Sequence, residues 1–134
     1  MAVLVPNRTK SDAQFLNTAR ELEKCTRKRC ISAPKRYTFY GLQELWQTSR
    51  RIHSGVKRGN SIYPNNQHEA QMRRDCFMQA RADIQDYVSQ LELLLDDQIL
   101  GIPAGEELSG LVGKEDGLIQ SLMKSDKARY ASLP

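Results

Sequence analysis

The sequence has little of the material from which metal and redox sites are built. Its 134 residues include 2 histidines and 3 cysteines. His53 and His68 stand in no H-x-x-x-H or E-x-x-H arrangement, which would present two ligands on one face of a helix. Cys25 and Cys30 are 5 positions apart, wider than the C-x-x-C pair of zinc ribbons, and no second pair completes a ligand set. We therefore expect no metal and no other cofactor.

Catalytic motifs are missing as well. The chain contains no glycine loop leading from a strand, no G-x-x-x-x-G-K and no G-x-S-x-G. Carboxylates are adjacent at Asp96 and Asp97 and again at Glu106 and Glu107, but neighbouring helical residues point about 100° apart. We interpret them as solvated charges near helix ends rather than as acid–base pairs. The sequence thus predicts a non-enzymatic protein.

Long apolar runs are a third absence. No run approaches the roughly 20 residues that cross a bilayer, and we find no charged-then-apolar leader at the start. Hydrophobic residues make up 40% and charged residues 27%, which is ordinary for a soluble globular protein. Because the number of cysteines is odd and no leader is found, we expect a cytoplasmic protein. The length suits a single domain over residues 1–134, with an ordered core at about 11–125 and flexible ends.

Apolar residues recur instead at three-to-four spacing, which is typical of amphipathic helices. This pattern predicts helices over 11–30, 38–63, 66–101 and 103–126, with Ser11 or Asp12 capping the first, Thr38 the second, and Pro103 in the first turn of the last. With short connections and no β-type alternation, the fold class is all-α, an antiparallel up-down-up-down four-helix bundle. Six residues are predicted to share one core: Leu45, Trp46, Ile52, Ile84, Leu91 and Leu122.

The stretch "SAPKRYTFYG", residues 32–41, separates the first two helices. Pro34 disfavours a helical conformation at the preceding residue, so the first helix must end before it. The aromatic residues Tyr37, Phe39 and Tyr40 could stack on nucleic-acid bases, but at a helix start they are expected to pack against the end of the bundle.

Charge is distributed unevenly along the chain. Residues 1–81 carry 16 Lys or Arg against 6 Asp or Glu, whereas residues 82–134 carry 4 against 10. This asymmetry suits either a polyanion-binding surface or self-association of basic and acidic faces. The candidate nucleic-acid-binding or partner-binding cations follow three helices and the junction between two of them: Arg20, Lys24, Arg27, Lys28, Lys35, Arg36, Arg50, Arg51, Lys57, Arg58, Arg73, Arg74 and Arg81.

The order of several short motifs resembles a known family. A first helix is followed by "PKRYTF", a second carries "GN" before "IYP", and a long third opens with "RRDCFMQARADI" and runs into "LELL". Over about residues 11–125 this order is similar to the four-helix-bundle family of Avd, the accessory variability determinant protein of diversity-generating retroelements. Bundles encoded within ribosomal RNA intervening sequences are related to it.

The resemblance implies a subunit of a homopentameric barrel that binds a reverse transcriptase and RNA or DNA through basic surfaces. Lys35 and Arg36 match the family's Pro-Lys-x-Arg-like junction, Asn60 its Ala-Asn-like pair, and Arg74 its arginine early in the third helix. The chain departs from the pattern at Gly59, where alanine is usual, in "SLMKSDK" at the end of the last helix, and in "GKEDG" within it.

The function expected from this resemblance and from the charge is that of a non-enzymatic accessory protein. It would bind nucleic acid and the reverse transcriptase of a diversity-generating retroelement and support mutagenic cDNA synthesis. The alternative is a self-assembling or protein-docking helical bundle with no nucleic-acid role.

Overall fold

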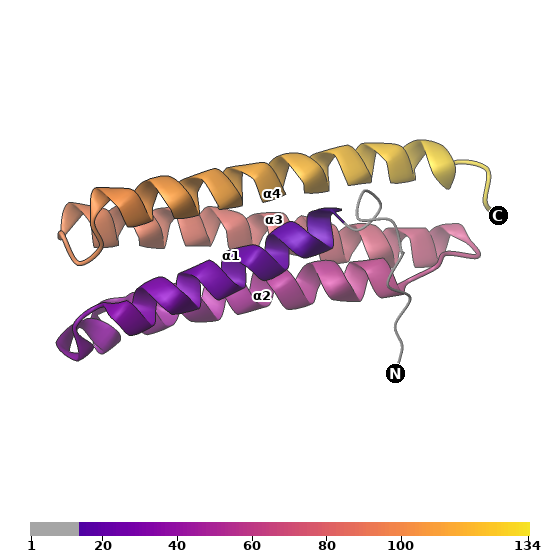
Figure 1. The fold of residues 1–134 in the computed structure, drawn as a ribbon. Coiled ribbons are helices and arrows are strands. Elements are labelled where there is room, and N and C mark those ends of the chain that lie inside the picture. Colours follow the sequence, from indigo (N-terminus) through magenta and orange to yellow (C-terminus); the bar gives the residue numbers. More distant parts are fainter. Residues whose placement is uncertain (1–13) are drawn as a thin grey trace.

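The computed structural model describes residues 14–134, and this part of the chain is helical with no strand. Four long helices follow one another: α1 (Gln14–Ser32), α2 (Leu42–Ser61), α3 (Gln67–Asp96) and α4 (Ile102–Arg129). A short 3-10 helix, η1 (Lys35–Tyr40), lies between α1 and α2. Figure 1 shows the long helices lying alongside one another. The all-α prediction is confirmed, whereas the predicted caps Ser11 and Asp12 lie outside the described residues.

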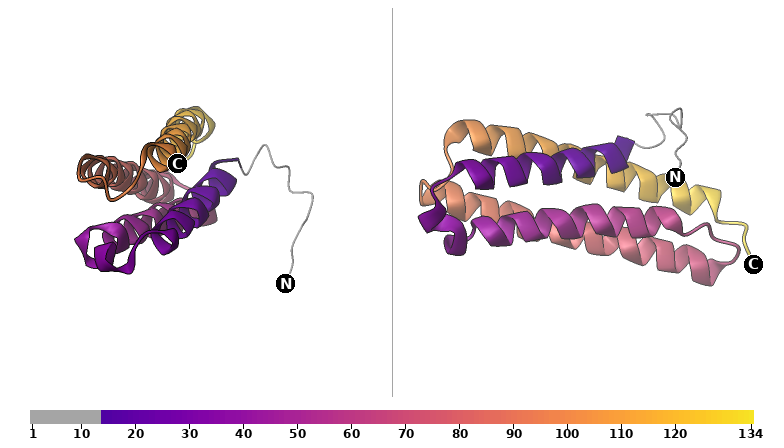
Figure 2. Two further views of the ribbon diagram at one scale, coloured as in Figure 1. Left: turned by 60° about the vertical axis from the view of Figure 1, so that its left-hand side comes forward. Right: turned by 60° about the horizontal axis from the view of Figure 1, so that its bottom comes forward.

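Each long helix packs against two others, in the order α1–α2, α2–α3, α3–α4 and α4–α1, as two further views illustrate (Figure 2). The core is formed by apolar residues at three-to-four spacing on every helix. Of the six residues predicted to share it, Leu45, Ile52, Ile84 and Leu91 are buried. Leu122 is half-buried and packs against the core, and Trp46 is half-buried.

Close contact between α2 and α3 leaves no room for a side chain at Gly59. A Cβ atom added to Gly59 would lie 2.7 Å from a ring carbon of Phe77, a buried core residue. One turn earlier, a Cβ on Gly55 would lie 3.5 Å from the Cβ of Ala80. The two helices therefore approach each other at positions where α2 carries no side chain.

The start of the second helix differs from the prediction. Residues 35–40 form η1, and α2 begins only at Leu42, because Gly41 adopts a φ of +120° that an α-helix does not accommodate. Thr38 is therefore not the cap of α2. Tyr37 does pack against the core, but Phe39 and Tyr40 are 88% and 72% exposed, so their predicted packing at the bundle end is wrong.

The connection between α3 and α4 is also longer than predicted. Helix α3 ends at Asp96 rather than at residue 101, since Gln98 has a φ of +59° and the N–H groups of Ile99 and Leu100 both donate to the carbonyl of Leu94. Pro103 lies in the first turn of α4, as predicted.

The residues after the end of α4 contact the start of α3. Helix α4 continues to Arg129, and the backbone N–H of Gln67 donates to the carbonyl of Pro134 at 2.9 Å. The Gln67 side chain donates to the carbonyls of Tyr130 and Leu133. Among the helices that the structure describes, none has the length and apolar character that a membrane span requires.

Candidate nucleic-acid interface

Positive charge is concentrated on two neighbouring helices. Helices α1 and α2 together carry 9 Lys or Arg against 3 Asp or Glu, whereas α3 and α4 carry 7 against 11. Because α1 packs directly on α2, their charges reinforce one another over one continuous region. We call the exposed surface of these two helices the α1–α2 face.

The cations of α1 point away from its buried side. That side is formed by residues such as Phe15, Leu22 and Thr26, so side chains between them in the helical period turn outward. All four predicted α1 cations are exposed: Arg20, Lys24, Arg27 and Lys28.

The cations of α2 form two rows. Arg50 and Lys57 are seven residues apart, two turns along the same side, and both line a groove with Glu23 of α1. Arg51 and Arg58 form the second row; Arg51 also lines the groove and lies 3.6 Å from Asp83 of α3. Together the rows cover the outer side of α2.

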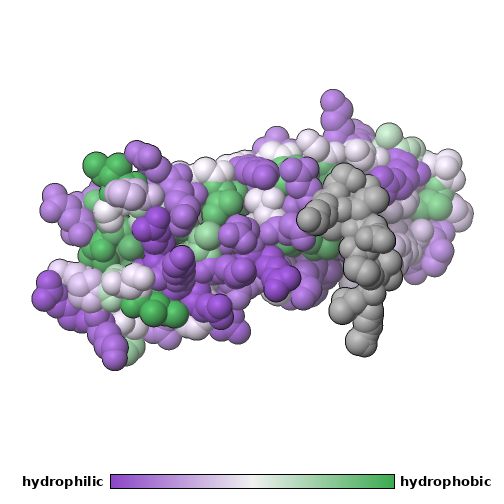
Figure 3. All heavy atoms as spheres, viewed as in Figure 1, coloured by the Kyte–Doolittle hydropathy of each residue, from purple (hydrophilic) through white to green (hydrophobic). Residues whose placement is uncertain are grey.

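The α1–α2 groove has a polar floor. His53 and Glu23 meet in it, with the His53 Nδ1 atom 2.8 Å from a Glu23 carboxylate oxygen, and this contact joins the two helices. The Arg50 guanidinium lies 5.6 Å from the centre of the Trp46 ring, an arrangement that holds this cation near the groove. Figure 3 shows one side of the molecule, on which hydrophilic side chains cover much of the surface over α1 and α2.

In the part of the chain that the structure describes, most cations of the α1–α2 face have no ion-pair partner. Within residues 14–134, Arg51 is the one predicted α2 cation with an ion pair, and none of the four α1 cations has one. The unpaired set is Arg20, Lys24, Arg27, Lys28, Arg50, Lys57 and Arg58. These seven exposed charges can neutralise phosphates without first breaking an internal ion pair.

Arg73 is not one of the exposed cations. It is 4% exposed, and its guanidinium donates to Asp126 of α4 at 2.7 Å and to the carbonyls of Gly59 and Ile62 at the end of α2. It also lies 5.1 Å from the centre of the Phe77 ring. The prediction that Arg73 is an accessible cation is therefore corrected: it connects α2, α3 and α4 in the interior.

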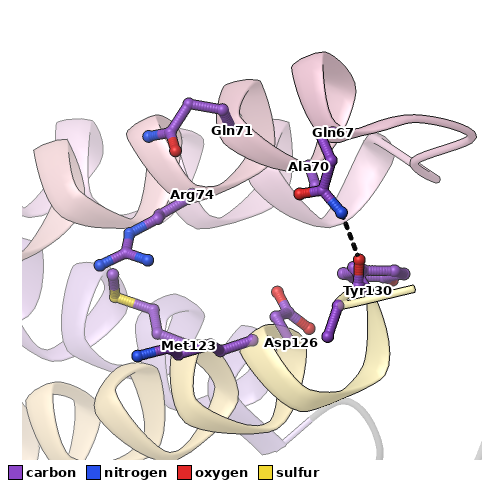
Figure 4. A pocket seen from close by; sticks show the side chains of 9 residues that line it. Gln67, Ala70, Gln71, Arg74, Met123, Asp126 and Tyr130 are labelled. Carbon is purple, nitrogen blue, oxygen red and sulfur yellow. Dashed lines mark hydrogen bonds between the residues drawn. The ribbon is translucent and has the colours of Figure 1, made fainter. Parts of the chain in front are cut away.

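The other two cations of α3 lie on the side that faces α4, apart from the α1–α2 face. Arg81 is paired with Asp116 of α4 at 3.0 Å. Arg74 is exposed and lines a small pocket between the start of α3 and the end of α4 together with Gln71 and Lys127 (Figure 4). The structure thus brings the cations of α1 and α2 together and separates those of α3 from them.

Lys35 and Arg36 extend the positive surface at the end of the molecule that holds η1. Both are exposed, and Arg36 covers its neighbour Tyr37, with the guanidinium carbon 4.8 Å from the ring centre and a hydrogen bond of 3.0 Å to the phenol oxygen. In the described residues neither cation has an acidic partner within ion-pair distance.

Glu115 is a buried acidic residue that was not predicted from the sequence. It is 0% exposed, both carboxylate oxygens lack a hydrogen-bond partner in the described structure, and burial raises its pKa from 4.5 to about 8. Its position in the sequence indicates burial, because Glu115 lies at helical spacing between the buried residues Leu108, Val112 and Ile119. At neutral pH it is a neutral acid inside the core.

Burial affects the reactivity of two cysteine thiols, Cys25 and Cys30. Burial raises the pKa of the Cys30 thiol to about 11 and that of Cys25 above its usual value, which disfavours the nucleophilic thiolate in both. Among the residues that the structure describes, no group of three or more His, Cys, Asp or Glu side chains is placed to hold a metal ion.

Comparison with known proteins gives no relative: no family model, no curated protein and no solved structure matches this chain.

Proposed function

We propose that this protein binds RNA or DNA through phosphate contacts made by the α1–α2 face. The observation that carries the proposal is the set of seven exposed cations on two packed helices, none of which has an ion-pair partner in the described residues. Lysine and arginine on a helix surface reach backbone phosphates readily, and each contact releases condensed counterions.

The same geometry argues against strong sequence preference. The face offers arginine and lysine side chains in rows along two helices, and the chain carries no recognisable base-reading motif. Phosphate contacts position a protein on nucleic acid without reading its bases. We therefore expect similar affinity for pools of different sequence.

The resemblance to Avd supplies the proposed biological setting. In this proposal the chain is an antiparallel up-down-up-down four-helix bundle, a cytoplasmic, non-enzymatic accessory protein of a diversity-generating retroelement. It assembles as a homo-oligomer such as a pentamer, binds the element's reverse transcriptase and supports mutagenic cDNA synthesis. A reverse-transcriptase gene and a template repeat beside the gene for this protein would support this setting, and their absence would count against it.

The second candidate function is self-assembly or protein docking without nucleic acid. It is favoured by the acid excess of α3 and α4, which complements the α1–α2 face, and by an apolar groove between α3 and α4. Leu91, Leu95 and Val112 line that groove.

The deciding experiment measures binding of a mixed RNA pool and a mixed DNA pool by two charge-matched variants. The face variant changes Arg50, Arg51, Lys57 and Arg58 of α2 to Gln; the control changes the four cations of α4, Lys114, Lys124, Lys127 and Arg129, to Gln. Both variants lose four positive charges, so a general charge effect weakens both equally.

We expect the face variant to lose most of the affinity for both pools and the control to lose much less. Circular dichroism and light scattering should show unchanged helix content and mass in each variant. Equal affinity of the parent and the face variant would refute the proposed surface. Loss of a protein partner alone, with nucleic-acid binding intact, would favour the docking candidate.

A further inference from the structure

The end of the molecule that holds η1 exposes large aromatic side chains. Phe39 is 88% and Tyr40 72% exposed, and Ile31 at the end of α1 is 75% exposed. Their neighbour Tyr37 packs against the core, so η1 already has one aromatic residue that fastens it to the helices. Phe39 and Tyr40 are thus not needed for that purpose, and their exposed apolar surface is available to a partner.

The charges that neighbour these rings in the sequence indicate the kind of partner. The segment Lys35–Tyr40 contains two cations and no acidic residue, and Lys28 in the last turns of α1 is a further exposed cation. Glu44 in the first turn of α2 is the nearest acid in sequence after η1, and its carboxylate accepts a hydrogen bond from Gln90 of α3 at 3.0 Å. Rings flanked by cations suit a ligand that combines flat apolar groups with negative charge.

The η1 surface is continuous in sequence with the α1–α2 face. At about 1.5 Å per residue, the α2 helix from Gly41 to Lys57 spans about 24 Å, with Arg50 between them. A flexible strand that contacts Lys57 and Arg50 through its phosphates can therefore continue to the exposed rings. Duplex ends keep their bases stacked in the helix, whereas an unpaired strand has free base faces to offer.

We infer that Phe39 and Tyr40 form a stacking platform for unpaired bases, so that the nucleic acid bound by this protein is single-stranded where it reaches η1. Proteins that bind single strands combine a positively charged track with aromatic rings in this manner. The inference rests on the proposed nucleic-acid function and specifies its substrate class: a single strand, or the single-stranded part of a folded RNA.

The test compares single-stranded and duplex oligonucleotides of about 12 nucleotides, in RNA and DNA forms, within the ~4–16 nucleotide range of single-strand binding folds. The main variant is Phe39→Leu with Tyr40→Leu, which keeps apolar side chains but removes the aromatic faces. The matched control is Phe39→Trp, which keeps an aromatic face. Both sites are exposed, so neither variant should affect the core.

We expect the double Leu variant to bind single strands about 10-fold more weakly or worse, because each stacked base contributes about 5-fold to 150-fold in affinity. Its duplex affinity should be unchanged, and Phe39→Trp should bind single strands like the parent. A 2-aminopurine base in the strand should lose fluorescence on binding to the parent and not to the double Leu variant. RNA and DNA arms show which strand the platform favours.

Two results would overturn the inference, and they are distinguishable. If the parent binds nucleic acid but the double Leu variant binds single strands equally well, the platform is refuted while the α1–α2 face stands. If the parent binds no oligonucleotide at low salt, both fail together. A change of oligomer mass in the double Leu variant, with nucleic-acid affinity unchanged, would assign the rings to contact between copies of the chain.

Discussion

Replacing Arg73 by Met should destabilise the protein strongly, although one long side chain replaces another. Arg73 is 4% exposed and donates four hydrogen bonds: two to Asp126, at 2.7 and 3.4 Å, and one each to the carbonyls of Gly59 and Ile62. Its removal leaves a carboxylate that is 13% exposed without its main partner, and two carbonyls at the end of α2 without a donor.

Breaking a buried ion pair by removing one partner costs about 3–5 kcal/mol. Arg129 lies 3.9 Å from the same carboxylate and can compensate in part, so we expect Arg73→Met to lower the free energy of unfolding by about 3 kcal/mol. That is a large share of the 5–15 kcal/mol typical of a domain. Replacing both partners, by Arg73→Met with Asp126→Leu, should recover part of the loss because no buried charge is then left alone.

Urea denaturation followed by far-ultraviolet circular dichroism measures this free energy of unfolding. The control is Arg74→Met, the adjacent residue in sequence, which is exposed and has no ion pair in the described residues, so its change should stay within about 0.5 kcal/mol. A value below about 1 kcal/mol for Arg73→Met, or equal values at the two positions, would refute the assignment of Arg73 to the interior.

Three further predictions concern the core and the assembly. Leu91→Ala, at a buried core position, should cost about 2–5 kcal/mol in the same urea assay, and a loss below 1 kcal/mol would contradict its placement. Burial raises the pKa of Glu115 from 4.5 to about 8, so between these pH values the folded state holds a proton that the unfolded state releases. The free energy of unfolding should therefore fall by up to about 5 kcal/mol as pH rises from 4.5 to 8. Glu115→Met should remove this fall, and an unchanged pH profile would show that another group is responsible. Light scattering should give a mass several times 15.3 kDa, and a monomer at tens of micromolar in low salt would remove the proposed homo-oligomer.

The helices could be predicted because their apolar residues recur with the helical period. The buried residues Leu45, Ile52, Ile84 and Leu91 followed directly from that repeat. The start of α2 could not be placed in the same way, because it depends on the positive φ of Gly41, and the sequence alone does not show which glycine takes that conformation.

The candidate site was predictable in part. The charge counts indicated a basic half, but a count treats every cation alike. Three of the predicted cations lie away from the α1–α2 face in the structure. Arg73 falls four residues before the buried Phe77 on the core seam of α3, a sign of burial that a charge count overlooks. Its partner Asp126 is 53 residues away, and no local pattern connects the two. Arg74 and Arg81 face α4 because of the rotation of α3 about its axis, which packing determines.

The salt dependence of nucleic-acid binding tests the central claim most directly. The dissociation constant of a mixed single-stranded pool is measured over a series of salt concentrations for the parent and for the face variant with Arg50, Arg51, Lys57 and Arg58 changed to Gln. If these four side chains contact phosphates, each contributes about 0.7 to 0.9 to the slope of log K against log salt concentration, so the slope should become about 3 shallower in the variant. Parallel lines for the two proteins, or binding by the parent that does not weaken with salt, would contradict nucleic-acid recognition by the α1–α2 face.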